Sequence, residues 1–375
     1  MREFEQARGG AEETLAAIVR PLIRWYRGVA RDLPWRHTQQ PYAVWVSEIM
    51  LQQTRVETVK PYYLRFVERY PDVAALSESG DELVKLWEGL GYYSRARNLR
   101  RAAVQIAERG GFPENFDGLC RLVGIGPYTA AAVASICFGE PVAAVDGNVL
   151  RVVSRLLCLE EDPAQPGLRK EIFGLLSRVM PQGRRGLGTV ERDTPFGQAR
   201  NDAGDFNQAM MELGACVCLP NGAPLCGACP LANLCGAHAL GTETSYPIRP
   251  EKKARRIEER TVFLIRFGEK YGIRKRPEQG LLAGLWEFPS ESGTLDEAAA
   301  REALARLRVD PQSVLPLGKA KHVFTHLEWH MTGFLCEANR LPKGGDLIFV
   351  GVEELSGAYA IPSALAYFRN LLKEI

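Results

Sequence analysis

The sequence of 375 residues lacks any uninterrupted apolar stretch that approaches the roughly 18 residues of a membrane span. Its first residues, MREFEQARGGAEETLAA, carry charges throughout and contain no apolar core of signal-peptide length. A large excess of one charge is also absent, since 47 Lys and Arg residues stand against 45 Asp and Glu residues. We therefore expect an intracellular protein without a membrane partner, whose overall charge does not by itself indicate a polyanionic ligand.

Histidine is scarce, with five residues, whereas nine cysteines are present. If the protein is intracellular, as we expect, these cysteines are not expected to form a disulfide framework. Their distribution is uneven, because five of the nine lie between Cys216 and Cys235. This clustering favours a metal centre over scattered structural thiols.

Four of the clustered cysteines, Cys218, Cys226, Cys229 and Cys235, follow the spacing C-x7-C-x2-C-x5-C. Structural zinc usually takes two closely spaced ligand pairs, whereas four thiolates with one close pair are more typical of an iron–sulfur cluster. We predict a 4Fe-4S cluster bound by these four residues in a loop over 216–238. Zinc and buried thiols are the alternatives, and Cys216 competes with Cys218 as first ligand.

The hydrophobic pattern changes along the chain and predicts two domains. Apolar residues recur at helical spacing from residue 12 to about 215, which indicates about ten helices in an all-α region over 1–240. Residues 182–204 are rich in Gly and Arg and are expected to form an exposed insertion. After a charged linker at 241–258, residues 259–375 predict a smaller α+β domain. Its expected strands are RTVFLIRF, LLAGLWEFP, KHVFTHLEWHMTGFLCEA and DLIFVGV, with helices near 296–307 and 363–373.

Residues 119–135 include the stretch LVGIGPYTAAAVAS, which predicts a helical hairpin with a glycine-rich turn. Gly124 and Gly126 allow a tight turn whose exposed N–H groups can point at an anion such as a DNA phosphate. This helix-hairpin-helix interpretation competes with a simpler one, in which the glycines serve helix packing alone.

A carboxylate, Asp146, follows the apolar run Ala143-Ala144-Val145 and precedes a helical stretch. An aspartate in this place usually caps the helix by accepting hydrogen bonds from its first free N–H groups. The alternative is that Asp146 faces a functional cleft, with capping as a second role.

The hairpin, the following aspartate and the four-cysteine loop, in that order, resemble the endonuclease-III superfamily of DNA glycosylases. The stretch LPWRHTQQPYAVWVSEIMLQQTRVETVKPYY resembles the adenine DNA glycosylases of the MutY type, and LLAGLWEFP and HVFTH resemble the lesion-reading, Nudix-like domain of that family. The chain departs from the family pattern in three places. It has seven residues rather than six between the first two cluster cysteines, Val123 where the hairpin usually has proline, and the insertion at 182–204.

The resemblance implies a monomeric enzyme of base excision repair that flips adenine out of double-stranded DNA containing A:8-oxoguanine or A:G pairs. By this resemblance Glu48 is the general acid, and Asp146 stabilises the oxocarbenium ion. Glu48 stands in WVSEIML among Trp45, Ile49 and Met50, where desolvation would raise its pKa, and a solvated helix face is the alternative. Tyr128 and Asn148 match positions near the sugar and the water. Tyr128 also stands where bifunctional relatives carry a Schiff-base lysine, so the expected enzyme is monofunctional.

The resemblance also implies which residues contact the DNA and the lesion. Arg31 and Trp35 are expected in the adenine pocket. Gln53, Thr54, Leu90 and Tyr92 are expected to wedge into the duplex beside the lesion. The alternative is that Leu90 and Tyr92 are core residues and Gln53 is a surface amide. Phe324, Thr325 and His326 are expected to contact 8-oxoguanine. The Nudix-like domain is not expected to hydrolyse a pyrophosphate, because the helical sequence REALARL lacks the glutamate pair that would bind the metal. A zinc site at His322, His326 and His330 is a weaker alternative. A pyrimidine-specific glycosylase and a non-catalytic DNA-binding protein with an iron–sulfur cluster are the rival interpretations.

Overall fold

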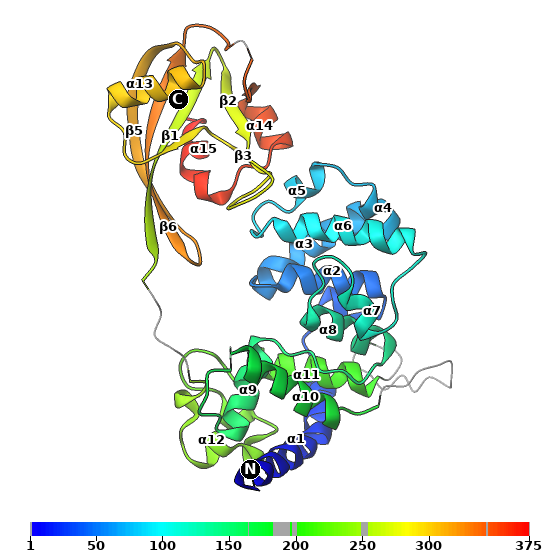
Figure 1. Ribbon diagram of the computed structural model, residues 1–375. Helices are drawn as coiled ribbons and strands as arrows, with labels where there is room; N and C mark the ends of the chain where they lie inside the picture. The colour runs from blue at the N-terminus through cyan, green and yellow to red at the C-terminus, as the bar shows by residue number, and fades with distance from the viewer. Residues whose placement is uncertain are drawn as a thin grey trace. The chain divides into compact units, whose positions relative to one another are not determined.

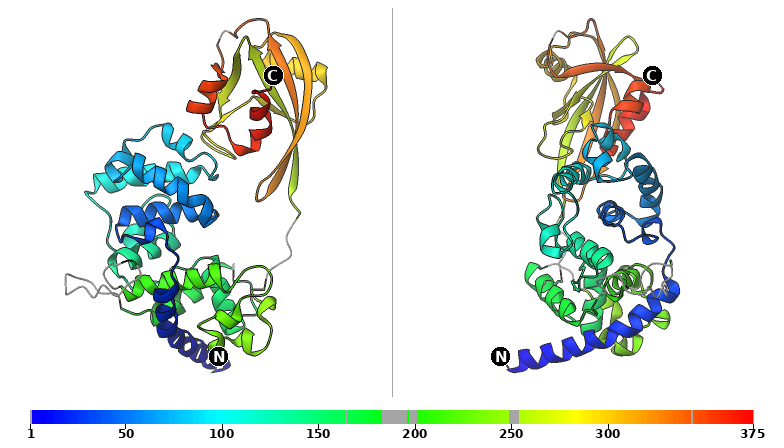
Figure 2. Two further views of the ribbon diagram at one scale, coloured as in Figure 1. Left: turned by 180° about the vertical axis from the view of Figure 1, so that it is seen from behind. Right: turned by 90° about the vertical axis from the view of Figure 1, so that its right-hand side faces the viewer.

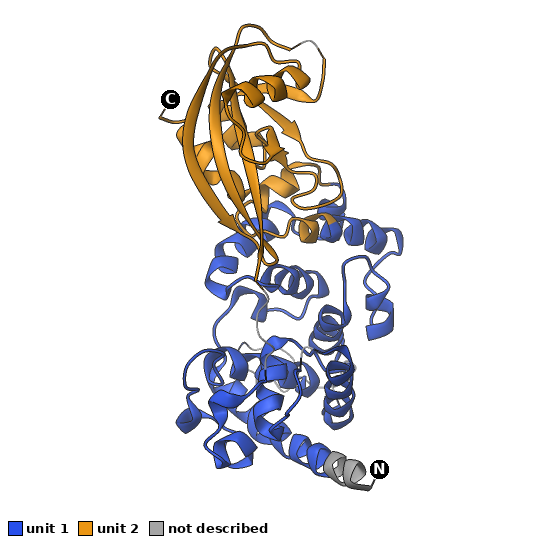
Figure 3. Ribbon diagram, turned by 60° about the vertical axis from the view of Figure 1, so that its left-hand side comes forward, with its two compact units in different colours: residues 1–78, 98–251 blue, residues 79–97, 252–375 orange. Residues whose placement is uncertain are grey.

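The computed structural model describes residues 2–163, 165–182, 196, 201–248, 254–342 and 344–374, with side chains from residue 10 onward (Figure 1). The chain forms two compact units, one of residues 1–78 and 98–251 and one of residues 79–97 and 252–375 (Figure 3). None of the described helices is both long enough and apolar enough to cross a bilayer.

Unit 1 is helical, which confirms the expected class of this part of the chain. Its helices before the hairpin are α1 (Arg2–Val29), η1 (Pro34–Arg36), α2 (Pro41–Leu51), α3 (Val56–Arg69), α4 (Val73–Ser77) and most of α6 (Ser94–Glu108). Its later helices are α7 (Phe116–Cys120), α8 (Pro127–Phe138), α9 (Gly147–Leu157), α10 (Pro166–Val179), α11 (Asp202–Cys216) and α12 (Gly236–Ala239). The cysteine loop adds η2 (Cys226–Ala228), η3 (Ala232–Leu234) and η4 (Glu243–Ser245).

The core of unit 1 follows from two kinds of helix. Helix α1 buries Leu15, Ile18 and Leu22, whose spacing places them on one face, against α9, α10 and α11. Helix α8, in contrast, is apolar on all sides and is buried from Thr129 to Ile136. It packs against α2, α7 and α11, because a helix without a polar face is stable only inside the protein. Helices α2, α8, α9 and α11 therefore meet in the interior.

Unit 2 contains a seven-stranded sheet, which confirms the expected α+β domain. The strand order is β3-β2-β1-β6-β5, with β4 paired to β1 and β7 paired to β2. Strands β1 and β6 are parallel and the other pairs are antiparallel. The strands are β1 (Arg256–Phe267), β2 (Lys270–Lys275), β3 (Trp286–Glu287), β4 (Ser290–Ser292), β5 (Pro311–Val323), β6 (Leu327–Ala338) and β7 (Leu347–Gly351).

Helices cover both faces of this sheet (Figure 2). Alternate residues of a strand point to opposite faces, so Phe263 and Ile265 pack toward α13 (Glu297–Arg306). Val262 and Leu264 pack on the other face with residues of α14 (Val352–Ala358), η5 (Ser363–Leu365) and α15 (Ala366–Leu371). Unit 2 also includes α5 (Glu82–Leu86) and the loop that follows it.

Some sequence-based predictions of local structure were wrong. Residues 201–204 are not part of an exposed insertion, because Asn201 caps α11 and Ala203 is fully buried. Residues 183–195 and 197–200 of that insertion lie outside the described residues, and so do residues 249–253 of the linker. Strand β1 begins at Arg256, inside the predicted linker. Most of its first five residues are charged and none is buried, which is why the sequence pattern suggested a linker there. LLAGLWEFP was predicted as a strand, but only Trp286–Glu287 pairs in the sheet. Its Gly284 has φ +68° and closes a turn instead.

Candidate active site

Unit 1 contains a cavity of about 530 Å³ between η1, α2, α8, α9 and α11. Eight of the residues predicted from the sequence line it: Arg31, Trp35, Glu48, Gln53, Thr54, Tyr128, Asp146 and Asn148. A second cavity of about 500 Å³ opens beside α1 and α10 and includes none of the predicted site residues. These residues line one cavity although Arg31 and Asn148 are about 117 positions apart in the chain. We take this cavity as the candidate active site.

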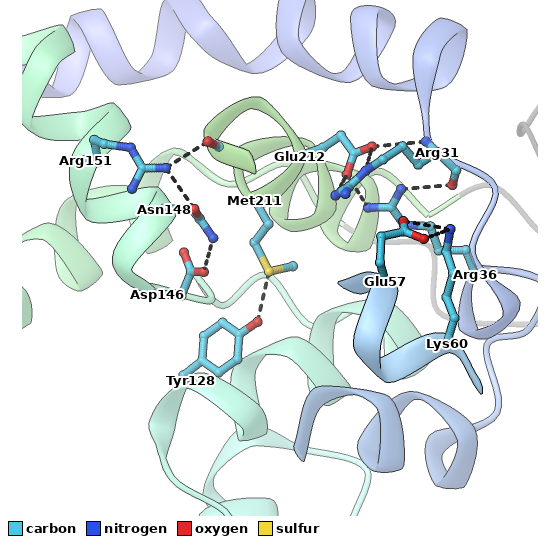
Figure 4. A network of polar contacts seen from close by, with 11 residues as sticks. Arg31, Arg36, Glu57, Lys60, Tyr128, Asp146, Asn148, Arg151, Met211 and Glu212 are labelled. Atoms are coloured by element: carbon cyan, nitrogen blue, oxygen red, sulfur yellow. Dashed lines mark hydrogen bonds and ion pairs between the residues drawn. The ribbon is translucent and has the colours of Figure 1, made fainter. Parts of the chain in front are cut away.

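Glu48 lies on α2 and is 6% exposed, so the solvated-surface alternative does not describe its position. The hydroxyl of Tyr128 donates a hydrogen bond to Glu48 Oε2 at 2.6 Å. It also contacts the sulfur of Met211 at 3.0 Å (Figure 4). Burial raises the pKa of Glu48 to about 7, an effect that the nearby Asp146 reinforces and the Tyr128 hydrogen bond opposes. A carboxyl group with this pKa can carry a proton near neutral pH.

Asp146 both caps a helix and faces the cavity. Its Oδ1 accepts from the Val149 backbone N–H at 2.8 Å, and its Oδ2 accepts from Asn148 Nδ2 at 2.7 Å. Burial raises the pKa of Asp146 above its ordinary value, while these hydrogen bonds and the charge of Arg151 lower it. Capping is therefore real, and it fixes the carboxylate in the orientation in which it lines the cavity.

Arg151, which the sequence analysis did not single out, connects Asn148 to the cysteine loop. Its Nη2 donates to Asn148 Oδ1 and to the carbonyl of Gly214, both at 2.8 Å (Figure 4). Its Nε donates to the carbonyl of Cys218, also at 2.8 Å. Gly214 allows this approach, because a Cβ atom there would lie 2.5 Å from the Cβ of Asn148. The position of Asn148, and through it Asp146, thus depends on the fold of the loop.

A second buried carboxylate, Glu212 on α11, was also missed. Its Oε1 accepts from Arg31 Nε at 2.8 Å, and its Oε2 accepts from Arg31 Nη2 at 2.7 Å and from Arg36 Nη2 at 2.8 Å (Figure 4). Hydrogen bonds and charge from both arginines lower the pKa of Glu212 to about 2 against the opposing effect of burial. The sequence signal was a single acidic residue in the apolar run of α11, MMELGA, the same pattern that surrounds Glu48.

Trp35 closes the cavity near these charges. Its ring packs edge-to-face on Tyr63 with ring centroids 5.3 Å apart, and the indole is 6% exposed. Arg31, Trp35 and Glu212 therefore combine an aromatic wall with a fixed anion and its paired cation, which is a suitable environment for a flat, polar heterocycle.

The glycine-rich turn has the geometry expected of a helical hairpin. Gly124 has φ +74°, and a Cβ atom there would lie 2.6 Å from the Cβ of Asn98. Gly126 caps α8 at its N-terminus, and Pro127 begins that helix. Gly124 is thus accounted for by backbone geometry and packing, whereas a Cβ atom at Gly126 would meet no atom within 4 Å. The turn leaves the first N–H groups of α8 at its end.

The residues predicted to enter the duplex have different environments. Gln53 is exposed and has φ +57°, in the left-handed region, and Tyr92 is 47% exposed with φ +47°. Thr54 is half-buried and lines the cavity. Leu90, in contrast, is 5% exposed and occupies a packing position in unit 2. Left-handed backbone at non-glycine residues is strained and is frequent at ligand-contacting loops.

The four predicted cluster cysteines surround one small cavity of about 30 Å³, together with Arg155 and His238. Arg155 Nη1 lies 3.1 Å from Cys218 Sγ, as a hydrogen-bond donor does beside a thiolate. Cys216 is outside this lining and lies near Glu212 instead. Among described residues, the ligand atoms of Cys226, His238 and Glu243 also lie within 4.8 Å of one another. The four-thiol arrangement fits a cluster, and the mixed triad is the alternative metal site.

The predicted lesion-reading residues lie at the turn between β5 and β6 in unit 2. The Phe324 N–H donates to the Leu327 carbonyl at 2.8 Å, which closes the turn and leaves Thr325 and His326 exposed. The hydroxyls of Tyr92 and Thr325 are 2.9 Å apart and share a hydrogen bond. His322 packs on Phe324, and His330 lies near Glu328 and Glu259, so these histidines do not converge on one point in the described structure.

Comparison with known proteins places both units in described families. Residues 46–177 match the HhH-GPD superfamily of base excision DNA repair proteins, and residues 261–370 match the NUDIX domain. The chain is similar to a solved thermostable thymine-DNA glycosylase, with 28% identity and a TM-score of 0.51 over 61% of this chain and 98% of that one.

Two curated relatives cover most of the chain. The adenine DNA glycosylase of Arabidopsis thaliana is 35% identical over 82% of this chain and 55% of its own length. The adenine DNA glycosylase of Rattus norvegicus is 34% identical over 84% of this chain and 69% of its own length. This chain thus spans little more than half of the plant relative and just over two thirds of the rat one. The buried carboxylates, the helical hairpin and the Nudix-like unit agree with this similarity, and the chain belongs to the adenine DNA glycosylase family.

Proposed function

We propose that this protein is a monofunctional adenine DNA glycosylase that removes adenine paired with 8-oxoguanine or guanine. The observation that carries the proposal is the cavity in which Glu48 and Asp146 meet in different environments, one buried against Tyr128 and the other anchored by hydrogen bonds. Pairs of carboxyl groups with separated pKa values divide acid and charge-stabilising roles in glycoside cleavage.

Glu48 acts as the general acid in this mechanism. Neutral adenine is a poor leaving group, so it must gain a proton as the bond to deoxyribose breaks. Tyr128 donates to Glu48 Oε2, which leaves Oε1 as the oxygen that carries the transferable proton. Burial raises the pKa of Asp146, but three hydrogen bonds favour its charged form, and its carboxylate stabilises the positive charge that develops on the sugar.

The base itself would bind between Trp35 and the Glu212–Arg31 pair. Arg31 and Arg36 occupy the acceptor positions of both Glu212 oxygens, so Glu212 orients Arg31. The Arg31 side chain is 35% exposed, and its guanidinium would donate a hydrogen bond to a ring nitrogen of adenine. The residues that line the cavity, all of them described, include no lysine. Without an amine to form a Schiff base, water adds to the sugar carbon that has lost the base and gives up a proton, so the reaction is a hydrolysis that leaves an intact strand at the abasic site.

Double-stranded DNA would bind through the hairpin turn at Gly124 and Gly126, and 8-oxoguanine would be read by Thr325. 8-Oxoguanine differs from guanine by an N7–H donor and an O8 acceptor, which a hydroxyl can address. The supporting observation is that Thr325 is exposed beside Tyr92, another residue expected at the lesion.

A 4Fe-4S cluster bound by Cys218, Cys226, Cys229 and Cys235 would have a structural role. It supplies a cross-link that holds the loop, and no acid or base of the proposed chemistry lies among its ligands. Arg155 would donate to the Cys218 sulfur, and Cys216 would stay outside the ligand set.

A base-release assay on a duplex with one A:8-oxoguanine pair tests the proposed activity. Adenine release without strand cleavage is expected. Release of an oxidised pyrimidine instead would favour the pyrimidine-specific alternative, and binding without release of any base would favour a non-catalytic DNA-binding protein.

Adenine release should depend on pH through both carboxyl groups. Glu48 must be protonated, and because its pKa is about 7, the single-turnover rate should fall about tenfold per pH unit well above pH 7. Asp146 must be ionised, so the rate should also fall in acid, at a pH above the ordinary range of an aspartate. Tyr128→Phe removes a hydrogen bond that lowers the Glu48 pKa, and should shift the alkaline limb to higher pH. A flat profile between pH 6 and 9 would contradict the role of Glu48.

The preference for 8-oxoguanine should depend on the Tyr92–Thr325 pair. Thr325→Val keeps the shape of the side chain but removes the hydroxyl, and should lower the rate ratio of A:8-oxoguanine to A:G by roughly five- to 150-fold. Tyr92→Phe should lower it by a smaller factor, about fivefold, because only the orienting hydrogen bond is lost. Thr294→Val is the control, since Thr294 is an exposed threonine of unit 2 whose hydroxyl donates to Glu259 Oε2 at 3.3 Å. Equal ratios in Thr325→Val and wild type would exclude Thr325 as the lesion-reading hydroxyl.

A further inference from the structure

Three strands of unit 2 bring a cation and three aromatic rings together on one face of the sheet. In the parallel pair of β1 and β6, Glu258 lies opposite Trp329 and Arg260 opposite Met331. In the antiparallel pair of β5 and β6, His322 lies opposite Trp329. Since alternate residues of a strand share a face, Arg260, Trp329 and His322 lie on the same side, and Phe324 joins them at the turn.

These side chains form a continuous series of contacts, called the stack below although its rings meet edge-to-face. The guanidinium carbon of Arg260 lies 4.3 Å from the ring centroid of Trp329. The Trp329 ring meets Phe324 edge-to-face at 5.0 Å, and Phe324 meets His322 at 4.6 Å. The stack therefore runs from the middle of the sheet to the first residue of the turn that carries Thr325.

Trp329 is the fixed member of this stack. It is 2% exposed, and its indole N–H donates to Glu258 Oε2 at 3.0 Å. Arg260 is held against it, because Nη1 of Arg260 donates to Ser290 Oγ at 3.2 Å. The buried Nε of Arg260 has no hydrogen bond among the described residues and lies 4.0 Å from Glu258 Oε2. Its main contact on that side is thus the face of the tryptophan, where a partly desolvated cation–π interaction is strongest.

Two further arginines lie near Arg260. Arg274 and Arg276 both pair with Glu287, and Arg276 lies 5.9 Å from the Trp329 ring centroid. Burial and these neighbouring cations lower the pKa of Arg260. The local charge is positive, because Glu287 pairs with two of the three arginines and Glu258, near Arg260, also pairs with Arg256.

The turn itself has few other anchors. Thr325 and His326 are exposed, and the backbone bond between Phe324 and Leu327 sets the bend but not its direction relative to the sheet. Phe324 is half-buried and packs with the hydrophobic residues on the Trp329 side of the sheet. The direction in which Thr325 presents its hydroxyl therefore depends on where Phe324 rests, together with the hydrogen bond that this hydroxyl shares with Tyr92.

We propose that Arg260 and Trp329 are positioning residues that set the preference for 8-oxoguanine by fixing Phe324 and thereby the lesion-reading turn. The inference rests on the proposed function, since it concerns how Thr325 is aimed at the opposite base. Neither residue needs to contact DNA for this role. Both act through packing, and Arg260 acts through the tryptophan.

The test compares single-turnover adenine release from A:8-oxoguanine and A:G duplexes by full-length variants. Arg260→Met keeps the length of the side chain but removes the cation, and should lower the rate ratio roughly three- to tenfold. Arg260→Lys should restore part of that loss. Trp329→Phe keeps an aromatic ring but shortens the platform under Phe324, and should lower the ratio by a similar factor. The rate on A:G should stay near that of the wild type in all three.

Arg266→Met is the matched control. Arg266 lies on the same strand and the same face as Arg260, but it pairs with Glu337 at the far end of β1. Circular dichroism melting separates loss of fold from loss of preference, and if Arg260→Met unfolds, Trp329→Phe and Arg260→Lys decide the question.

An unchanged rate ratio in Arg260→Met and Trp329→Phe would overturn the proposal. Equal weakening of binding to both duplexes, with a reduced salt dependence in Arg260→Met, would also overturn it, since Arg260 would then contact a phosphate. If the wild-type protein itself shows no preference for A:8-oxoguanine, the proposed function fails first, which the wild-type arm reveals independently of the variants.

Discussion

Glu48→Gln is expected to abolish adenine release while DNA binding stays within roughly tenfold of wild type. Glutamine has nearly the same shape, but it cannot donate the proton that the leaving base requires. The Tyr128 hydroxyl can still donate to the amide oxygen, so the site should keep its geometry. The measurement is the single-turnover rate on an A:8-oxoguanine duplex, beside the dissociation constant of the same duplex.

Asp146→Asn should have a similar effect for a different reason. The amide oxygen can still cap α9 by accepting from the Val149 N–H, so the helix should form, but the negative charge that stabilises the sugar cation is lost. Glu57→Gln is a control for both variants, because Glu57 is an exposed glutamate on α3 that pairs with Lys60 outside the cavity lining. A near-wild-type rate in either active-site variant would refute the role assigned to that residue.

Cys226→Ser and Cys229→Ser are expected to cause loss of iron, misfolding of the loop and loss of DNA binding. The loop from 217 to 240 contributes only Val217, Leu231 and Ala237 to the buried hydrophobic residues, which is too little to hold it without a cross-link. The effect should reach the cavity, because Arg151 binds both the Cys218 carbonyl and Asn148. The measurements are iron content, expected at about four per wild-type chain, visible absorbance and thermal melting.

Cys216→Ser is the matched control, since Cys216 lies outside the small cavity, and the variant should retain iron. Loss of iron in this variant alone would instead move the first ligand from Cys218 to Cys216. Stoichiometric zinc in protein purified without oxygen would contradict the cluster. If that zinc were lost in His238→Gln, the metal would be assigned to Cys226, His238 and Glu243.

The local sequence was sufficient for the features that depend on neighbouring residues. The period of apolar residues predicted the helices of unit 1, and the switch to strand patterns predicted the α+β unit, because burial on one face imposes a repeat on the sequence. A carboxylate inside an apolar run, as at Glu48, predicted burial and a raised pKa. Strand β2 and the first half of β5 were not predicted, since glycine, proline and charged residues interrupt their alternation.

The sequence by itself determined the two domain types, the family and the residue types available for chemistry. Only the tertiary structure decided which of them act together. Glu212 is held by Arg31 and Arg36 from 181 and 176 residues away, and Cys218 rather than Cys216 faces the other cysteines. Burial of Leu90 and exposure of Tyr92, two residues apart, were likewise decided by packing in unit 2. Sequence patterns record whether a side chain prefers water or the interior, whereas partners, orientation and pKa depend on long-range contacts that no local window of the sequence contains.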